Sequence, residues 1–539
     1  MAGAVGRCAV AKTRGLVLMV LLGCAGVALA QAPAGAPHLG KVYFQASCSA
    51  EAQPLLDKGL ALLHSFQYKE ARQTFEQAQA ADGQCAMAHW GKAMSLWEQL
   101  WSVPDEKQIQ EGREEIAEAQ KLHPGTAKEQ GFLVAAAAFY RDNAKLTHTD
   151  RIKAYAASME QLHKQMPDDV EVGAFTALGL VVLADNDDDV NGLEEQKKAI
   201  AILNPLFEKY PDHPGVAHYL IHAADRPELA PEGLAAARRY AEIAPDSAHA
   251  IHMPSHIFVR LGLWQDSINS NLAAWAVARR AAEEHRAEAH YQIHAMDFLT
   301  YSYLQTGQEA KAREVIAQLD QVVGADEASK AQHRAYFEAV TTLDLNRWKE
   351  AAGLKVPAIR RDEQDSAYWA RAIGAARSGD VAGAQASVQH LAECVQARQD
   401  RARKEGYKVS AEKATDLREA EAWLAYAQGK TEEALNELRA AAAHEEKNGS
   451  DGVIIPAREM LADMLLEMKR NSDALAEYSV VLKNAPNRFD ALLGAGRSAR
   501  AMGDSAGAQV FYAKLAENCP GGADRPELNE AKTIAAKRQ

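Results

Sequence analysis

The fold of this chain is decided by residues 489–517, FDALLGAGRSARAMGDSAGAQVFYAKLAE. In this stretch the small residues Gly496 and Ala508 are followed by the larger Tyr512 and Leu515. The same succession of small, small and aromatic side chains occurs 34 residues earlier, at Ala462, Ala474 and Tyr478. Small side chains let two helices approach closely, and larger ones fill the gap to a neighbouring unit. The sequence therefore predicts stacked helix pairs, since signals for strands are nearly absent.

This spacing resembles the tetratricopeptide repeat (TPR), a pair of antiparallel helices about 34 residues long. The N-terminal part repeats it with Gly59, Ala71, Phe75 and Ala78. Further units are marked by pairs of residues at two repeat positions, Gly262 with Ser267, Gly307 with Ala312, Gly379 with Ala384, and Gly429 with Ala434. The resemblance covers most of residues 50–517. It implies an all-α fold, a TPR-type α-solenoid of antiparallel helix pairs with a concave inner face.

The N-terminus has the order of a secretory signal peptide. A short basic segment precedes the apolar run Leu16–Leu22, and the small residues Ala28 and Ala30 stand before Gln31. We expect cleavage after Ala30 and a periplasmic or secreted protein. The segment LLGC, which ends at Cys24, loosely resembles a bacterial lipobox. The alternative is therefore a membrane-anchored lipoprotein with a lipid anchor at Cys24.

The repeat pattern and the changes in composition predict five segments. These are a signal peptide at 1–30, a flexible leader at 31–49, an N-terminal TPR array with a His-rich groove at 50–392, a charged linker or helix at 393–410, and a C-terminal TPR array with a capping helix at 411–539. The net charge of −13 disfavours binding to nucleic-acid phosphates. No stretch after the leader approaches the ~20 apolar residues of a membrane helix, so we expect no transmembrane segment.

Six cysteines in 539 residues are too few for a disulfide scaffold. Cys48 and Cys85 are 37 residues apart, and each directly precedes the first helix of one of two consecutive repeat units. Both therefore lie on the same edge of the stack, and export would place them in an oxidising compartment. We predict a disulfide between Cys48 and Cys85, with two free or buried thiols as the alternative.

Histidines gather between residues 213 and 294, in pairs spaced four apart. His218 and His222 form one pair, and His252 and His256 form an equivalent pair 34 residues later. Residues four apart lie on one helix face with Cβ atoms ~5–6 Å apart, so two imidazoles can share one metal ion. If these side chains bind a metal, we expect all four to converge on one zinc or copper ion.

Pro254 lies within the segment that carries the second pair. An interior proline removes a backbone hydrogen bond, so it either kinks the helix there or begins a new one. In the second case His249 and His252 would lie in the loop before it. The carboxylates nearest in sequence, Asp225 and Asp297, are expected to accept hydrogen bonds from the ring nitrogens that face away from a metal.

In the TPR family the first helix of each pair presents side chains to the concave groove where ligands bind. The resemblance implies that the paired histidines face this groove. The same stripe carries further candidate ligand-binding residues, namely His249, Arg260, Asp225, His290, His294, Asp297 and Tyr301. A histidine on a helix is usually a hydrogen-bonded, partly buried residue, but three such pairs on neighbouring helices are hard to explain by packing alone.

Two functions of different class are consistent with this pattern. One is an exported scaffold that binds a peptide, a partner protein or a small ligand in the groove. The other is a metal-binding protein or a metal-dependent hydrolase that uses the His pairs. Neither H-E-x-x-H nor a Walker A motif occurs, and no residue stands out as a general base. The sequence therefore favours the scaffold over an enzyme.

Overall fold

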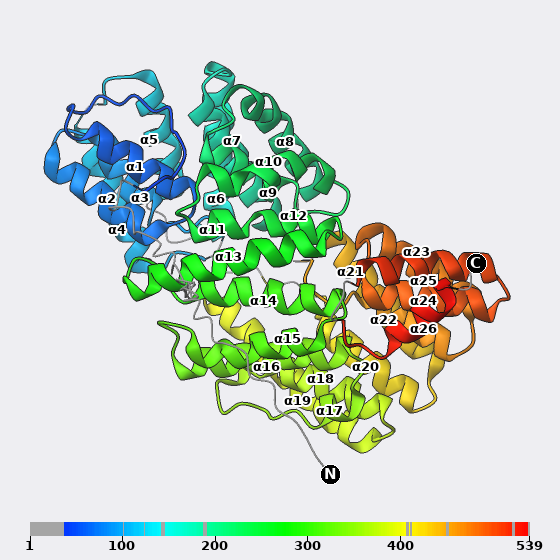
Figure 1. Ribbon diagram of the computed structural model, residues 1–539. Coiled ribbons are helices and arrows are strands. Elements are labelled where there is room, and N and C mark those ends of the chain that lie inside the picture. Colours follow the sequence, from blue (N-terminus) through cyan, green and yellow to red (C-terminus); the bar gives the residue numbers. More distant parts are fainter. Residues whose placement is uncertain are drawn as a thin grey trace, which may run out of the picture. The chain divides into compact units, whose positions relative to one another are not determined.

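The computed structural model describes residues 37–536, with gaps at 101, 123, 142–145, 187–190, 406–408, 410–411, 449–451 and 520–522. Within that part the chain is all α, with helices α1 to α26, two short 3-10 segments and no strand (Figure 1). The predicted all-α TPR-type solenoid is confirmed. The predicted signal peptide and Cys24 lie outside the described residues. None of the described helices is long and apolar enough to cross a membrane.

The first helices run from the N-terminal disulfide to the histidine-rich segment and slightly beyond it. They are α1 (Gln53–His64), α2 (Tyr68–Ala81), α3 (Ala86–Met94), α4 (Glu106–Lys121), α5 (Ala127–Phe139), α6 (His148–Gln165), α7 (Val170–Asn186), α8 (Gly192–Lys209), α9 (Pro214–Ala223), α10 (Ala230–Ile243), α11 (Ala248–His252), α12 (Pro254–Arg260), α13 (Trp264–Glu283), α14 (His290–Gln305) and α15 (Glu309–Ala317).

The remaining helices complete the array. They are α16 (Glu327–Asp344), α17 (Trp348–Ala352), α18 (Asp365–Arg377), α19 (Val381–Lys404), α20 (Thr415–Ala427), α21 (Thr431–Asn448), α22 (Ala457–Glu467), α23 (Asn471–Asn484), α24 (Phe489–Ala501), α25 (Ser505–Asn518) and α26 (Glu527–Ala535). Two 3-10 segments, Gln318–Gln321 and Arg361–Glu363, lie between them. Residues 393–404, at the predicted charged linker or helix, belong to α19.

Helices that follow one another in the chain pack together, as α1 does on α2 and α24 on α25. Glycines make this packing possible. The ring of Phe75 on α2 lies against both Gly59 of its own pair and Gly91 of the next helix, where an added Cβ would come within 2.7 Å and 2.3 Å of the ring. Gly496 and Tyr512 are in the same relationship in the C-terminal part, at 3.0 Å. The small and large repeat positions therefore meet at the seams between helices.

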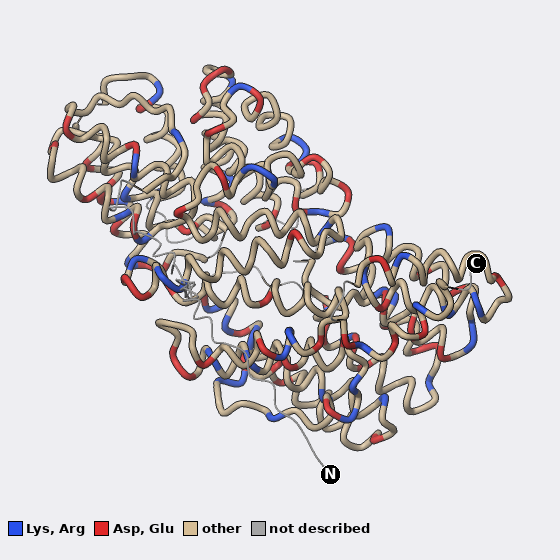
Figure 2. The backbone as a smooth tube through the Cα atoms, in the orientation of Figure 1, with Lys and Arg blue, Asp and Glu red and all other residues tan. Residues whose placement is uncertain are grey.

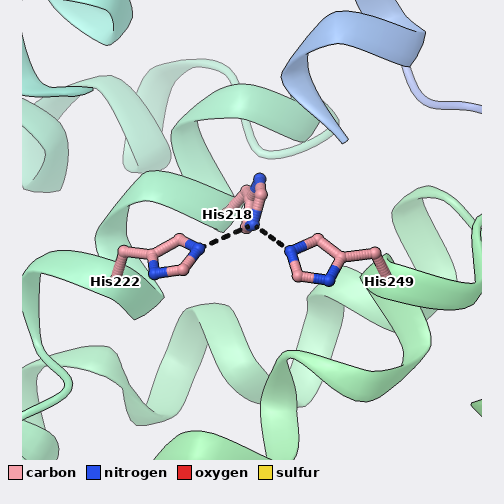
Figure 3. A group of neighbouring side chains, drawn as sticks. All are labelled: His218, His222 and His249. Carbon is pink, nitrogen blue, oxygen red and sulfur yellow. Dashed lines mark hydrogen bonds between the residues drawn. The ribbon is translucent and has the colours of Figure 1, made fainter. Parts of the chain in front are cut away.

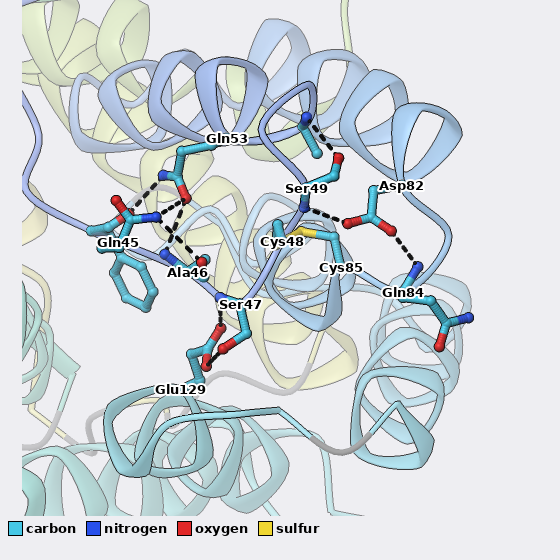
Figure 4. The surroundings of a disulfide bond; sticks show 12 residues. Gln45, Ala46, Ser47, Cys48, Ser49, Gln53, Asp82, Gln84, Cys85 and Glu129 are labelled. Carbon is cyan, nitrogen blue, oxygen red and sulfur yellow. Dashed lines mark hydrogen bonds between the residues drawn. A yellow bond between two sulfur atoms is a disulfide. The ribbon is translucent and has the colours of Figure 1, made fainter.

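The predicted disulfide between Cys48 and Cys85 is confirmed, with Cα atoms 4.6 Å apart (Figure 4). It ties the segment before α1 to the start of α3. The backbone N–H of Ser49 donates to Asp82 at 2.6 Å, so this crossing is also held by a hydrogen bond. The two other cysteines of the described part, Cys394 and Cys519, are buried free thiols.

A buried network of charges joins helices that are far apart in the sequence. The guanidinium of Arg488, which is fully buried, donates to Glu459 at 2.7 and 2.8 Å and to Asp344 at 3.0 Å. It also donates to the hydroxyl of Tyr301 on α14 at 2.6 Å. Arg525 adds a second ion pair to Asp344, at 3.4 Å. Elsewhere acidic and basic residues are interspersed along most of the described chain (Figure 2).

Candidate metal centre of two histidine triads

Three histidines from α9 and α11 gather their ring nitrogens at one point. Nε2 of His218 lies 3.1 Å from Nε2 of His222 and 3.0 Å from Nε2 of His249 (Figure 3). The ring of Phe66 packs over all three, with centroids 4.4 to 5.7 Å away. We call these histidines triad 1. His218 and His222 are the first predicted pair, and the third member comes from the next repeat unit.

Three further histidines, from α11, α12 and α14, form triad 2. Nε2 of His252 lies 3.1 Å from Nε2 of His256, and the ring of His294 is centred 4.3 Å from that of His252. In each triad one nitrogen per ring lies within 4.8 Å of the other two. The four histidines expected around one ion are thus divided between two neighbouring groups of three.

The helix break at Pro254 accounts for this division. α11 ends at His252 and α12 begins at Pro254, because proline has no N–H to continue the helix. His249 and His252 therefore lie on a short helix of their own rather than in a loop. His249 joins triad 1 and His252 joins triad 2. The shared helix holds the two triads side by side, with the rings of His249 and His252 centred 6.2 Å apart.

The protonation state of His252 follows from its outer hydrogen bond. Its Nδ1 lies 2.6 Å from Oδ1 of Asn271 on α13. The amide nitrogen of Asn271 donates to the carbonyl of Ser267 at 2.8 Å, which identifies the atom facing His252 as the oxygen. Nδ1 of His252 must therefore carry the proton, and Nε2 presents a lone pair toward His256.

His256 is held in the same way by a carboxylate. Its Nδ1 donates to Oδ2 of Asp225 at 2.8 Å, while Oδ1 of Asp225 accepts from Nε of Arg260 at 2.8 Å. Burial opposes the charge of Asp225, but Arg260 and His256 outweigh it and hold the pKa of that carboxyl well below its usual range. Asp225 is therefore ionised, and both of its oxygens already accept hydrogen bonds. It positions His256 and is not free to act as a general base.

In triad 1 the outer nitrogen of His218 also faces an oxygen. Its Nδ1 donates to the backbone carbonyl of His64 at 2.6 Å, which leaves a lone pair on Nε2 at the centre of the triad. Burial lowers the pKa values of His218 and His249 well below the usual value, and neighbouring histidines lower them further. Burial lowers the pKa of His222 to about 3. These rings are neutral near pH 7, as metal ligation requires.

A third group, His64, Glu171 and His213, has different chemistry. Nε2 of each histidine donates to a separate oxygen of Glu171, at 2.9 and 3.1 Å. Nδ1 of His64 accepts from the hydroxyl of Tyr219, and Nδ1 of His213 accepts from the backbone N–H of Val216. In this group every ring nitrogen therefore has a hydrogen-bond partner of the opposite kind. In triad 2, by contrast, Nε2 of His252 and Nε2 of His256 face each other.

The remaining candidate residues from the sequence, His290, Tyr301 and Asp297, lie outside the two triads. His290 is exposed, with its Nδ1 3.6 Å from Glu288, and belongs to neither triad. Tyr301 is buried, accepts from Arg488 and donates to the backbone carbonyl of Ile454 at 3.1 Å. Asp297 is partly exposed on α14, and the acceptor for His252 is Asn271 instead. No periodic signal in the sequence marks Asn271, which lies on the second helix of its pair.

Residues 490–522 match the family model of the tetratricopeptide repeat. The chain contains a TPR. No curated protein matches it in sequence. The solved structures similar to it include a human IFIT1 dimer with m7Gppp-AAAA, at 13% identity and a TM-score of 0.36, covering 88% of this chain and 95% of that one. They also include yeast Tom70, at 12% identity and a TM-score of 0.33, covering 90% and 96%. Values this low carry no inference about a ligand.

The two triads lie on three consecutive TPR-type units. Their first helices are α9, the interrupted α11 and α12, and α14, and the second helices are α10, α13 and α15. All six histidines come from first helices. Repetition of a TPR-type unit therefore brings side chains of equivalent positions together, and the break at Pro254 distributes them between two centres.

Proposed function

We propose that this chain is a TPR scaffold that binds transition-metal ions, zinc or copper, with one ion at each histidine triad. The observation that carries the proposal is the approach of His252 to His256. Both rings hold a proton on Nδ1, so in their neutral forms two lone pairs face each other at 3.1 Å. That gap has no room for a water molecule, and a cation coordinated by both nitrogens removes the repulsion.

The spacing of the nitrogens suits such an ion. Zinc with nitrogen ligands at ~2.0–2.1 Å in a tetrahedron holds those ligands ~3.3 Å apart. The measured separations are 3.0 and 3.1 Å in triad 1 and 3.1 Å in triad 2. Protonation of one ring is the competing solution, and since burial lowers the pKa of His252 well below its usual value, the ring that would take the proton is His256, beside the ionised Asp225. Metal loading, described below, distinguishes a bound cation from an imidazolium at His256.

We propose further that the protein works outside the cytoplasm, in the periplasm or as a secreted protein. The support is the N-terminal order of basic, apolar and small residues together with the disulfide between Cys48 and Cys85, a bond typical of oxidising compartments. A peptide or partner protein bound along the array is part of this proposal, and a lipoprotein anchored at Cys24 is the alternative to cleavage after Ala30.

Metal binding is tested by loading the purified chain with zinc and with copper and counting bound ions. We expect two ions per chain for the natural sequence. His252→Ala combined with His294→Ala should remove one, and His218→Ala combined with His249→Ala should remove the other. His290→Ala, on the same helix as His294, is the matched control and should keep both ions. Retention of full stoichiometry after loss of a triad would refute the proposal.

A further inference from the structure

A second site lies away from the triads, in a cavity of about 270 Å³ bordered by α16, α18, α19, α20 and α21. Its wall combines aromatic and acidic side chains. Tyr336 and Trp369 supply the aromatic surface, and Glu419 and Glu445 supply carboxyls. The proposed metal-binding function uses none of these residues, so the cavity needs a separate explanation.

Glu419 is the unusual member of this wall. Its side chain is buried, at 3% exposure, and its Oε2 accepts one hydrogen bond, from the indole nitrogen of Trp369 at 2.7 Å. No lysine or arginine of the described residues lies within ion-pairing distance of it. Burial raises its pKa well above the usual range, and the nearby Glu445 raises it further. A buried carboxyl without a cation is costly, so such groups commonly serve a ligand.

Glu445 on α21 has a similar position. Its Oε2 accepts from the backbone N–H of Ala457 at 2.9 Å. The arginines near it are engaged elsewhere, since Arg458 donates to Glu446 at 2.6 Å and Arg488 belongs to the buried network described above. Burial raises the pKa of Glu445 to about 7. Two carboxyls therefore border one cavity, and neither forms an ion pair within the described part of the chain.

The other acids of the cavity are already neutralised in part. Arg398 on α19 pairs with Asp416 at 3.1 Å and also with Asp365. The whole wall thus contains four carboxyls and one guanidinium. A cation is the complement of such a surface, and the apolar Val340 and Ile455 beside it favour a cation that also has hydrocarbon parts.

A bare metal ion does not fit this arrangement. Among the described residues, the groups of three or more side chains whose ligand atoms lie within 4.8 Å of one another are the two triads and the Glu171 network, and the cavity acids are not among them. Carboxyls that are spread around an aromatic wall suit a larger cation, because an ammonium group can pair with a carboxylate while its carbon atoms contact an aromatic face. We propose that this cavity binds a small organic amine in its ammonium form, with Glu419 as the carboxylate partner, which releases its proton to solvent on binding, and Trp369 as its aromatic wall.

The test is calorimetric titration of the full chain with 1,4-diaminobutane, with 1,4-butanediol as the uncharged analogue of the same length. We expect saturable binding of the diamine and none of the diol. Glu419→Gln should weaken binding at least about tenfold, because the ion pair between ammonium and carboxylate is replaced by a hydrogen bond to a neutral amide. The exposed Glu432→Gln on α21 should bind like the natural sequence.

Folding of the variants is checked by thermal melting, and Glu419→Gln should melt no lower than the natural protein since it removes a buried acid. Should that variant fail to fold, Glu445→Gln and Trp369→Phe carry the same test. Equal binding of the diol, unchanged affinity of every variant, or binding of Mg²⁺ in place of the diamine would each overturn the proposal. The test is independent of the triads, because His252→Ala should leave diamine binding intact.

Discussion

Nε2 of His252 and Nε2 of His256 face each other at 3.1 Å, each on a ring whose other nitrogen already donates to an oxygen. The two acceptors differ in charge, since Asn271 is neutral and Asp225 is anionic. An anionic acceptor makes the imidazole a stronger ligand because it stabilises the positive charge that the ring takes on when it binds a cation. His256 should therefore bind more strongly than His252.

Replacing the carboxylate of Asp225 should weaken metal binding at triad 2. For Asp225→Asn we expect a zinc affinity ~10–100 times lower, because the amide no longer stabilises the charged form of the His256 ring. Calorimetric titration with zinc measures the change. Asp266→Asn, an exposed aspartate that lies 3.5 Å from Arg238, is the control. An unchanged affinity in Asp225→Asn would show that this carboxylate does not support a metal ligand.

Zinc should raise the melting temperature of the chain in a concentration-dependent manner. A ligand that binds only the folded state stabilises it by about 2.7 kcal/mol per site at ~100 times Kd. A chelator should reverse the shift completely. A variant that lacks His218, His249, His252 and His294 should not respond. If its melting curve shifts like that of the natural chain, the stabilising site lies elsewhere.

Reduction of the disulfide between Cys48 and Cys85 should destabilise the N-terminal units. Closing a loop with a separation of 37 residues is worth ~2–4 kcal/mol. Chemical denaturation with and without a reductant measures this difference. The double variant Cys48→Ser, Cys85→Ser should have the stability of the reduced natural chain in both conditions and should not respond to the reductant. A response in that variant would assign the effect to another thiol.

Gly91 should not tolerate a side chain. A Cβ atom there would lie 2.3 Å from the ring of Phe75, so Gly91→Ala should lower the free energy of unfolding by ~1–3 kcal/mol through overpacking. Gly83→Ala, at a position with no neighbouring atom within 4 Å, is the matched control. Equal stability of the two variants would mean that the seam between these helices is looser than described.

The contribution of Glu445 to stability should fall as the pH rises from about 4.5 to 7, opposite in sign to the contribution of the buried histidines, whose pKa values are lowered by folding. The folded chain holds the proton of Glu445 up to a pKa of about 7, whereas the unfolded chain releases it near the ordinary glutamate value. Unfolding therefore releases a proton in this window. The groups around Glu445 are Glu419, Glu446, Arg458 and Arg488. Relative to the natural chain, Glu445→Gln should therefore gain stability as the pH rises through this window, by at most about 1.4 kcal/mol per pH unit, as followed by denaturation of both proteins at several pH values.

Much of the fold could be predicted from the sequence because its evidence is local and repeated. Gly496 and Tyr512 meet across one helix pair, and the 34-residue repeat carries that contact to other pairs. Cys48 and Cys85 were found in the same way, from their equivalent places in consecutive units. The positions of the His pairs also followed from the repeat, but their division into two triads did not, because it depends on how the chain turns at Pro254.

Other parts of the structure depend on contacts without a sequence period. Asn271 lies on a second helix and reaches His252 only because α13 packs against α11. The cavity around Glu419 is formed by helices from several units, and none of its side chains belongs to a motif. Such contacts are set by the packing of whole helices, which a single sequence does not reveal.

Arg488 has a consequence for how the chain unfolds. In an open row of repeats each unit contacts only its neighbours, so the ends can fray without affecting the middle. Arg488 instead contacts Tyr301 and Asp344, which are 187 and 144 residues away in the chain. Loss of the last helices would leave the buried carboxylate of Asp344 without either of its guanidinium partners. Removing the C-terminal units should therefore destabilise the central helices that carry Tyr301 and Asp344, so the array cannot be shortened from that end one unit at a time.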